Sequence, residues 1–415
     1  MFPTKSLLSL LFIAVSLASD VTAIPTPRDS KATLTFARRF NISVGDGFPN
    51  IADADRARAK NFQSLGPANK GGQNKRAASI LATNQAASYT VDVGIGTPPT
   101  KYTLLIDTGS SNTWVGAGKA YVPTRSSKDT GEKVTVSYGS GSFSGEEFTD
   151  TVTLSPHLVI AKQSIGVAST SKGFQNVDGI IGIGPVDLTI GTLSPSTSQT
   201  IPTVTDNLFS KGAIREHLVS VAYAPTIAEG VQNGELTFGG IDLTRFVGEI
   251  TFVPITQTSP ASNFWGIDQS ITYGSTPILS STAGIVDTGT TLTLIASDAF
   301  ATYQKATGGV PDSATGLLKI TSAQYSALRD LHFKVGPRTF SLTPNAQIWP
   351  RALNTFIGGT ADSIYLIVAD IGTPSGQGLD FINGYTFLER FYSVYDTANK
   401  RVGLAATCQT DAWTN

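Results

Sequence analysis

The chain has 415 residues, of which 40% are hydrophobic and only 15% charged, with 41 glycines and a formal net charge of -1. This length accommodates one large core or two medium ones, and a low charge content with many glycines is typical of a β-rich, exported protein. The single cysteine, Cys408, excludes an intramolecular disulfide and a cysteine zinc site, and His157, His217 and His332 lack metal-ligand spacing. We therefore expect no metal and no cofactor.

The first 23 residues have the pattern of a signal peptide. Lys5 precedes an apolar run over residues 7–18, and Val21-Thr-Ala23 ends in small residues that a signal peptidase accepts. The run is too short to cross a bilayer as a helix. We expect a secreted, extracellular protein without a membrane anchor; the alternative is a membrane-tethered start.

Residues 24–76 form a basic segment with ten Lys or Arg and four acidic residues, a net charge of +6, whereas the chain from Ala77 onward carries -7. The segment ends in GGQNKR, a flexible stretch before a dibasic pair. We predict a removable pro-segment, cleaved after Arg76, whose positive side chains lie across an acidic cleft and are released when acid protonates the carboxylates opposite. The alternative is a disordered basic linker.

From residue 77 onward the sequence predicts mainly strands. The stretches 89–96, 101–109, 133–145 and 148–154 are short, rich in β-branched and aromatic residues, and separated by Gly, Pro or Ser. Helices are few: one is capped by Ser297 and ends at Gly308, and another opens with Thr321 and Gln324 in capping-box register. The predicted fold class is mainly β with a few short helices.

One motif occurs twice. LLIDTGSSNTWV at 104–115 matches GIVDTGTTLTLI at 284–295, which places Asp107 and Asp287 in equivalent turns. A hydrophobic-glycine element follows each motif, GIIGIG at 179–184 and FINGYTF at 381–387. The repeat predicts two similar β-rich lobes around a central cleft, an N-terminal lobe over 77–265 and a C-terminal lobe over 266–415.

The duplicated turn suits acid-base chemistry. Glycine lets each turn approach a neighbouring backbone, and a threonine hydroxyl can hydrogen-bond across to the opposite turn. Two carboxylates held face to face cannot both ionise cheaply, so they share a proton in acid and one acts as base while the other acts as acid. We expect the two side chains to lie within about 8 Å, the reach of one bridging water.

Three motifs together resemble the pepsin family of aspartic endopeptidases: Asp107-Thr-Gly-Ser-Ser-Asn-Thr-Trp114, Tyr138-Gly-Ser-Gly and Asp287-Thr-Gly-Thr. The stretches SSTAGIVDTGTTLTLIASDAF and LDFINGYTFLERFYSVYD are similar in particular to the polyporopepsin-type enzymes of basidiomycete fungi. The resemblance covers about residues 80–406. It implies the pepsin-like bilobal acid protease fold and a secreted endopeptidase, made as a zymogen, that hydrolyses peptide bonds at acid pH.

The resemblance also implies residue roles. Asp107 and Asp287 would activate a water for attack on a peptide carbonyl and then protonate the leaving nitrogen. Supporting positions in the two loops are Thr108, Gly109, Ser110, Thr288, Gly289 and Thr290. The hairpin VSYGSGSFSG would be a flap that binds substrate through Gly139 and Ser140, with Tyr138 hydrogen-bonded to Trp114 when closed. The alternatives for this hairpin are an ordinary exposed β-turn and, without the family, a phosphate loop.

The sequence offers candidates for one substrate pocket. Phe174 and Ile180 are candidates to line the pocket for the side chain before the cut bond, which favours large apolar residues; core packing is the alternative for both. Some fungal relatives have a flap aspartate that admits lysine, whereas this chain has Ser140, so we expect basic residues to be poorly accepted there. The chain departs from the family at Asn383, in an apolar slot, and at Tyr385, where an acidic residue is usual.

We expect as partners polypeptide substrates, the chain's own pro-segment as an intramolecular inhibitor, and statine-type inhibitors, with no nucleic acid, no membrane and a monomeric state. Which of Arg58, Lys60 or Lys70 meets the two aspartates is left open. The alternative function is a catalytically silent peptide-binding protein on the same scaffold, but such proteins typically lack one aspartate or the flap tyrosine. Paired carboxylates also occur in glycosidases, where Asp-Thr-Gly turns are rare.

Overall fold

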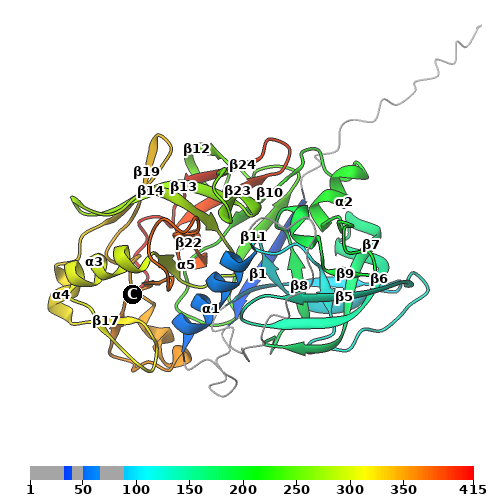
Figure 1. Cartoon of the computed structure of the whole chain (residues 1–415), viewed down its shortest axis with the longest axis horizontal. Coiled ribbons are helices and arrows are strands. Elements are labelled where there is room, and N and C mark those ends of the chain that lie inside the picture. The colour runs from blue at the N-terminus through cyan, green and yellow to red at the C-terminus, as the bar shows by residue number, and fades with distance from the viewer. Residues whose placement is uncertain (1–31, 40–49, 66–87, 175) are drawn as a thin grey trace, which may run out of the picture.

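The computed structural model of the chain describes residues 32–39, 50–65, 88–174 and 176–415. The predicted signal peptide, the predicted cleavage after Arg76, and Lys70 lie outside the described residues. The described chain folds mainly into strands, arranged in three sheets with a few short helices, so the predicted fold class is confirmed (Figure 1). No helix of the described residues is long and apolar enough to cross a membrane.

The largest sheet has 14 strands. Eight of them form one side of the molecule, in the order β2 (Ser88–Ile95), β3 (Thr100–Asp107), β8 (Gly179–Gly182), β4 (Trp114–Val115), β7 (Leu158–Lys172), β6 (Ser142–Ser155), β5 (Lys128–Ser137) and β9 (Leu193–Ser194). The other six continue the sheet through the centre, in the order β12 (Val247–Pro254), β24 (Arg401–Ala406), β23 (Phe391–Asp396), β10 (Leu218–Ala222), β11 (Gln232–Phe238) and β1 (Ala32–Arg39). The sheet thus joins strands from both predicted lobes and from the basic segment.

The opposite side of the molecule is built on a second sheet of seven strands. Their order is β19 (Arg338–Leu342), β18 (Leu331–Val335), β13 (Gly266–Tyr273), β14 (Thr276–Val286), β22 (Phe381–Asn383), β15 (Thr293–Ile295) and β21 (Val368–Asp370). A small third sheet contains β16 (Val310–Pro311), β17 (Leu318–Ile320) and β20 (Ile364–Tyr365).

The repeated motifs occupy equivalent places in the two large sheets. β3, which ends at Asp107, pairs in parallel with the hydrophobic-glycine strand β8, and β4 then pairs antiparallel with β8. β14, which leads to Asp287, pairs in parallel with β22, and β15 then pairs antiparallel with β22. Each motif therefore returns beside a hydrophobic-glycine strand, which is the structural basis of the sequence repeat.

Five α-helices and three 3₁₀ helices complete the described chain. They are α1 (Ile51–Ser64), α2 (Val204–Ser210), α3 (Ser297–Thr307), α4 (Ser322–Ser326), α5 (Tyr385–Leu388), η1 (Val186–Thr189), η2 (Ala261–Asn263) and η3 (Arg351–Ile357). The predicted capping box of Thr321 and Gln324 is present in α4, and α3 ends at Gly308 in the left-handed conformation, as predicted.

The predicted cap of α3 is wrong by one residue. Ala296 is the N-cap and makes no side-chain cap hydrogen bond, whereas Ser297 is the first helical residue. The Ser297 hydroxyl instead donates to Asp370 Oδ1 at 2.6 Å, in β21. A tertiary contact therefore takes the hydroxyl that the sequence pattern assigned to the helix end.

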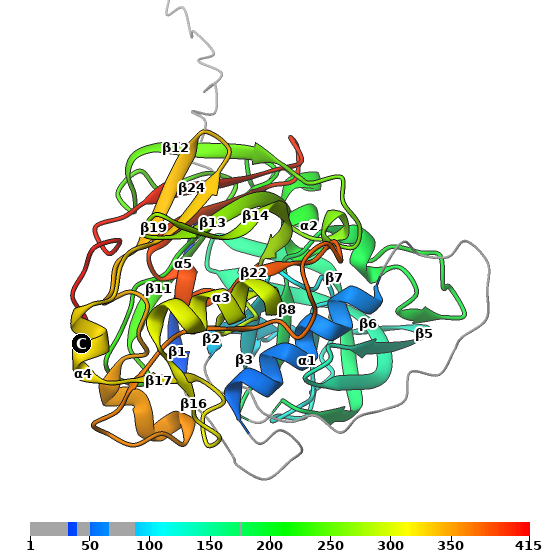
Figure 2. The ribbon, with the colours of Figure 1, turned by 60° about the vertical axis from the view of Figure 1, so that its left-hand side comes forward.

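Helix α1 belongs to the basic segment and lies across the centre of the molecule, between its two sides (Figures 1 and 2). Asn50 caps the helix by accepting from the Asp53 backbone N–H at 2.9 Å. Ile51, Asp55, Arg58 and Phe62 are buried, at a spacing of four, three and four residues, which is one helical face. Lys60 is exposed on the other side.

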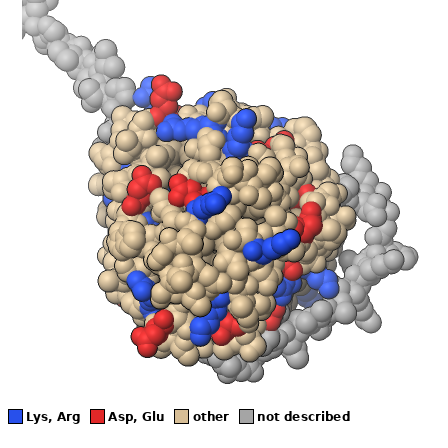
Figure 3. Space-filling view, turned by 90° about the vertical axis from the view of Figure 1, so that its left-hand side faces the viewer, with Lys and Arg blue, Asp and Glu red and all other residues tan. Residues whose placement is uncertain are grey.

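The surface carries few and scattered charges, as the composition predicts. On the face in Figure 3, basic and acidic side chains lie singly or in small groups over a mostly uncharged surface. The interior is one large apolar cluster that includes residues of both sides and of α1, together with two smaller clusters. Stability therefore rests on packing, and the one cysteine, Cys408, is free and exposed.

Candidate active site

The two Asp-Thr-Gly turns meet at the centre of the molecule. Asp107 ends β3 and its carbonyl accepts from the Ile183 backbone N–H at 2.9 Å, while the Asp287 backbone N–H donates to the Asn383 carbonyl at 3.1 Å. Each aspartate is thus fixed by the hydrophobic-glycine element of its own half. Trp265, the last residue of the predicted N-terminal lobe, donates from Nε1 to the Ile183 carbonyl at 3.2 Å.

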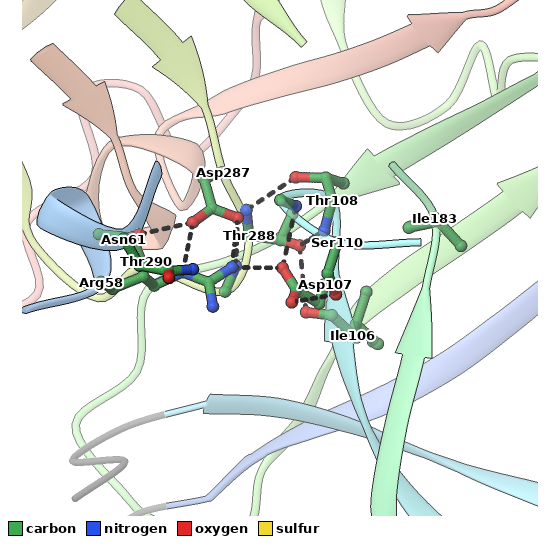
Figure 4. A network of polar contacts seen from close by, with 12 residues as sticks. Arg58, Asn61, Ile106, Asp107, Thr108, Ser110, Ile183, Asp287, Thr288 and Thr290 are labelled. Carbon is green, nitrogen blue, oxygen red and sulfur yellow. Dashed lines mark hydrogen bonds and ion pairs between the residues drawn. The ribbon is translucent and has the colours of Figure 1, made fainter. Parts of the chain in front are cut away.

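The threonines of the two turns cross-link them symmetrically (Figure 4). The Thr108 backbone N–H donates to Thr288 Oγ1 at 2.9 Å, and the Thr288 backbone N–H donates to Thr108 Oγ1 at the same distance. Each hydroxyl then donates to a carbonyl of the opposite strand, Thr108 to Val286 at 3.3 Å and Thr288 to Ile106 at 3.1 Å. These hydrogen bonds across the turns are the ones that the sequence predicts, and all their side chains are buried.

Both carboxylates are held in the same way by their own turn. Ser110 Oγ donates to Asp107 Oδ2 and Thr290 Oγ1 donates to Asp287 Oδ2, each at 2.5 Å. The Gly109 N–H donates to Asp107 Oδ1 at 2.9 Å, and the Gly289 N–H donates to Asp287 Oδ1 at 3.0 Å. Each carboxylate therefore has its inner and outer oxygen fixed by equivalent donors.

The two glycines are needed for the close approach of the turns. A Cβ atom on Gly109 would lie 2.7 Å from Asp287 Oδ1, and one on Gly289 would lie 2.5 Å from Asp107 Oδ1. Both separations are far below van der Waals contact, so an alanine at either position would push the opposite carboxylate away.

Arg58 of α1 lies between the two carboxylates (Figure 4). Its Nε donates to Asp287 Oδ2 at 2.8 Å, and its Nη2 donates to Asp107 Oδ1 at 2.6 Å and to Asp287 Oδ1 at 3.3 Å. The Oδ1 atoms are therefore at most 5.9 Å apart, the sum of the two Nη2 distances. This is within the roughly 8 Å expected for carboxylates that one water can bridge.

The pKa values of the three groups reflect this arrangement. Burial raises the pKa of Asp107, which the Arg58 charge only partly offsets and the Asp287 charge reinforces. Burial also acts on Asp287, but the charge and hydrogen bonds of Arg58 outweigh it and hold the Asp287 pKa below its usual value. Burial opposes the charge on Arg58, but the two aspartates more than offset this and raise its pKa. Asp287, which receives two of the three Arg58 hydrogen bonds, is thus the more readily ionised carboxylate.

The predicted flap is the turn between β5 and β6, where Tyr138 N donates to the Gly141 carbonyl at 2.7 Å and Gly139 has φ +76°. Tyr138 is buried and its ring lies over Trp114, with centroids 6.5 Å apart. Burial raises the Tyr138 pKa, and a side-chain hydrogen bond with Trp114 offsets part of this rise. That bond does not have regular geometry, since neither the Tyr138 hydroxyl nor Trp114 Nε1 has a partner of regular geometry in the described residues. The two ring planes are inclined by 25°.

Phe174 and Ile180 lie in the apolar cluster behind this hairpin. Phe174 meets Trp114 edge-on at 4.9 Å and Tyr138 at 5.3 Å, and Ile180 is fully buried in the same cluster. Both residues therefore pack against the hairpin through Trp114 and Tyr138.

Sequence reasoning missed several residues through which α1 holds the cleft. Asp55 accepts from the Thr291 and Leu292 backbone N–H groups, and Asn61 Nδ2 donates to the Ser137 carbonyl beside the flap at 3.1 Å. A Cβ on Gly139 would lie 2.5 Å from the Ala57 carbonyl oxygen, so α1 rests directly on the flap tip. The helical spacing of buried residues from Ile51 to Phe62 is the signal that could have found this face.

The two departures from the family pattern have local explanations. Asn383 Nδ2 donates to Gln269 Oε1 at 2.9 Å, and Gln269 Nε2 donates back to Asn383 Oδ1 at 3.2 Å. This reciprocal amide pair satisfies both buried side chains. Tyr385 is buried, its N–H donates to the Thr290 carbonyl at 2.8 Å, and its ring meets Tyr89 edge-on at 5.6 Å.

Residues 88–407 match the family described as eukaryotic aspartyl protease. The chain is 66% identical to polyporopepsin of Irpex lacteus over 340 residues, which is 82% of this chain and 100% of that protein. The chain belongs to the eukaryotic aspartyl protease family. It is also 31% identical to gastricsin of Cavia porcellus over 339 residues, 77% of this chain and 80% of that protein. The family resemblance predicted from the motifs is confirmed.

A solved structure agrees with these matches. The crystal structure of an aspartic proteinase from Irpex lacteus superposes with a TM-score of 0.78 at 66% identity, covering 79% of this chain and 96% of that one. This confirms the predicted pepsin-like bilobal fold. As a member of this family the chain is an aspartic endopeptidase, a hydrolase, as predicted.

Proposed function

We propose that the chain is a secreted aspartic endopeptidase made as a zymogen, with Asp107 and Asp287 as the catalytic pair. The observation that carries the proposal is the symmetric pair of buried carboxylates, each fixed by equivalent donors and both bonded to one guanidinium from the basic segment. The same group that pairs with the carboxylates would keep substrate away from them.

In the mature enzyme the two carboxylates would share a proton and hold a water between them. The ionised carboxylate takes a proton from the water as it attacks the peptide carbonyl, and the protonated one supplies a proton as the bond to nitrogen breaks. The inner donors Gly109 and Gly289 and the outer hydroxyls Ser110 and Thr290 would keep the carboxylates oriented through both steps. The cross-linked threonines Thr108 and Thr288 would hold the two turns in register.

The basic segment would be the intramolecular inhibitor. Its helix α1 lies across the cleft, rests on the flap tip and places Arg58 between the carboxylates. The match to the aspartyl protease family begins at residue 88, after the basic segment. Arg58, rather than Lys60, would be the basic residue that blocks the pair, because Lys60 is exposed.

The flap and the apolar cluster behind it would shape the pocket before the cut bond. Tyr138, Trp114, Phe174 and Ile180 lie together there, which supports a preference for large apolar side chains. Gly139 and Ser140 would bind the substrate backbone once α1 has left. A protein of this kind would act on polypeptides as a monomer and bind statine-type inhibitors.

The alternative is a peptide-binding protein without catalysis. Both aspartates, their hydroxyl and glycine donors and the flap tyrosine are present, which favours the enzyme. The test is hydrolysis of a denatured protein in acid by the processed chain, with and without a statine-type inhibitor. The proposal predicts cleavage that the inhibitor abolishes and a mature chain that begins near Ala77. Tight inhibitor binding without any cleavage would support the alternative.

A further inference from the structure

We propose that Asp55 is a second anchor of the autoinhibitory helix and occupies a carboxyl-binding site formed by the backbone N–H groups of Thr291 and Leu292. The inference rests on the proposed function and deepens it, because it assigns to the cleft a second point at which the pro-segment is held. The first point is the Arg58 contact described above.

The contact has the form of a fork. The Leu292 N–H donates to Asp55 Oδ2 at 2.7 Å and the Thr291 N–H donates to Asp55 Oδ1 at 3.3 Å, so each oxygen receives one backbone donor. Asp55 is only 6% exposed. Arg58, three residues further along α1, directs its Nε and Nη2 to Asp287 and Asp107 instead.

The two anchors engage the same loop at its two ends. Arg58 meets Asp287 at the start of the turn, and Asp55 meets the amides that follow four and five residues later. Residues three apart lie on one helical face, so a single face of α1 carries both a cation for the carboxylates and an acceptor for the amides. The helix is thereby fixed in one register along the cleft.

A side chain without acceptors at position 55 would remove the carboxyl acceptor of the Thr291 and Leu292 N–H groups. The penalty for an unsatisfied buried donor exceeds the net worth of the hydrogen bond itself. The site therefore selects a carboxyl group, or less well an amide, which has one acceptor oxygen and one donor nitrogen.

The Asp55 contact differs from a merely structural one because docking through it should depend on pH. Burial raises the Asp55 pKa to about 7 against the opposing Leu292 and Thr291 amides and the Arg58 charge, while the Asp287 charge adds to the rise. An ordinary aspartate, as in a released segment, has a pKa of about 3.9, so docking takes up a proton. The contribution of Asp55 is complete below that value and is lost as pH rises through about 7.

Asp287 responds in the opposite sense, since its pKa is lowered by docking and its contribution is lost as pH falls. Asp55 would therefore hold the segment in place while the pH begins to fall, and release would wait until Asp287 is protonated. The two anchors together would confine opening of the cleft to strong acid.

The test compares the full wild-type precursor with its Asp55→Leu and Asp55→Asn variants. Asp53→Asn is the matched control, because the Asp53 carboxylate accepts a hydrogen bond from Arg56 within the same segment. Opening of the cleft is measured as the affinity of a labelled statine-type inhibitor at about pH 5.5. We expect Asp55→Leu to bind it roughly tenfold to a hundredfold more tightly than wild type. Asp55→Asn should have an intermediate effect, and Asp53→Asn should have little. Equal affinity in wild type and Asp55→Leu, with both melting cooperatively, would overturn the proposal.

A second experiment does not require the precursor variants to fold. Synthetic peptides spanning residues 50–65, native or with Asp55→Leu or Asp55→Asn, are tested as inhibitors of the mature wild-type enzyme. The native peptide should inhibit roughly tenfold or more better than the Asp55→Leu peptide, and its advantage over the Asp55→Asn peptide should grow as pH falls from about 6 to about 4.5. Equal inhibition at all pH values would contradict the anchor. A native peptide that does not inhibit, or a mature chain without acid activity, would instead contradict the proposed function.

Discussion

Replacing Arg58 with alanine in the precursor should open the cleft. Arg58 is 4% exposed and makes three hydrogen bonds to two carboxylates that are themselves fully buried. Removing one partner of a buried ion pair typically costs about 3–5 kcal/mol, because the remaining charge is left without compensation. Here part of that cost is recovered, since two adjacent carboxylates can share a proton. We therefore expect a net loss of about 3 kcal/mol in docking, or roughly a hundredfold.

The effect should depend on pH with a definite sign. Arg58 lowers the pKa of Asp287, so its contribution to docking is present above the ordinary aspartate pKa and is lost as pH falls through the lowered value. The difference between wild type and Arg58→Ala should therefore be largest near neutral pH and shrink in acid.

Binding of a labelled statine-type inhibitor to the intact precursor measures this directly, because the inhibitor enters only an open cleft. Lys60→Ala is the matched control, since Lys60 lies on the same helix but is exposed. At about pH 6 the Arg58→Ala precursor should bind roughly a hundredfold more tightly than wild type, and Lys60→Ala should match wild type. If the Arg58→Ala precursor bound the inhibitor no more tightly than wild type, the reasoning would be refuted.

Three further predictions concern the flap, the cross-linked turns and a buried carboxyl. Tyr138→Phe should lower kcat/KM for peptide hydrolysis without abolishing it, because the ring packing on Trp114 and Phe174 remains; complete loss would mean that the hairpin is misinterpreted. Thr288→Val removes an acceptor for the Thr108 N–H and a donor to the Ile106 carbonyl, and should lower the free energy of unfolding by about 2 kcal/mol in urea, whereas the exposed Thr339→Val should change it little. Burial raises the pKa of Glu147 to about 7, opposed only by the Ser164 hydroxyl, so its ionisation costs stability as pH rises through that value. Glu147→Gln should therefore raise the melting temperature near pH 7 and leave it nearly unchanged near pH 4; an equal shift at both values would exclude the titration.

The sequence was most informative where a pattern repeats or a turn needs one residue type. The two Asp-Thr-Gly turns could be identified as equivalent because the geometry that joins them demands glycine at Gly109 and Gly289 and a hydroxyl at Thr108 and Thr288. The end of α3 could also be predicted, because Gly308 adopts a left-handed conformation that other residues avoid.

Contacts between distant segments that no repeat marks could not be predicted from the sequence. Ser297 was assigned to a helix cap, but its hydroxyl is taken by Asp370, 73 residues away. The choice between Arg58 and Lys60 depends on which face of α1 meets the cleft, and Asp55 depends on two backbone amides 236 and 237 residues away. No local pattern specifies such amide donors, because every residue except proline carries one.

The most direct test of the account is the activity of Asp107→Asn and Asp287→Asn after both have been processed to the mature length. Each replacement keeps the size of the side chain but removes the carboxylate that would share the proton. Hydrolysis of a denatured protein is followed at about pH 3 to 5, with thermal melting as the control for folding. The account predicts that both variants melt like wild type and that each loses at least about a thousandfold in rate. A rate within tenfold of wild type in either variant would contradict the catalytic pair.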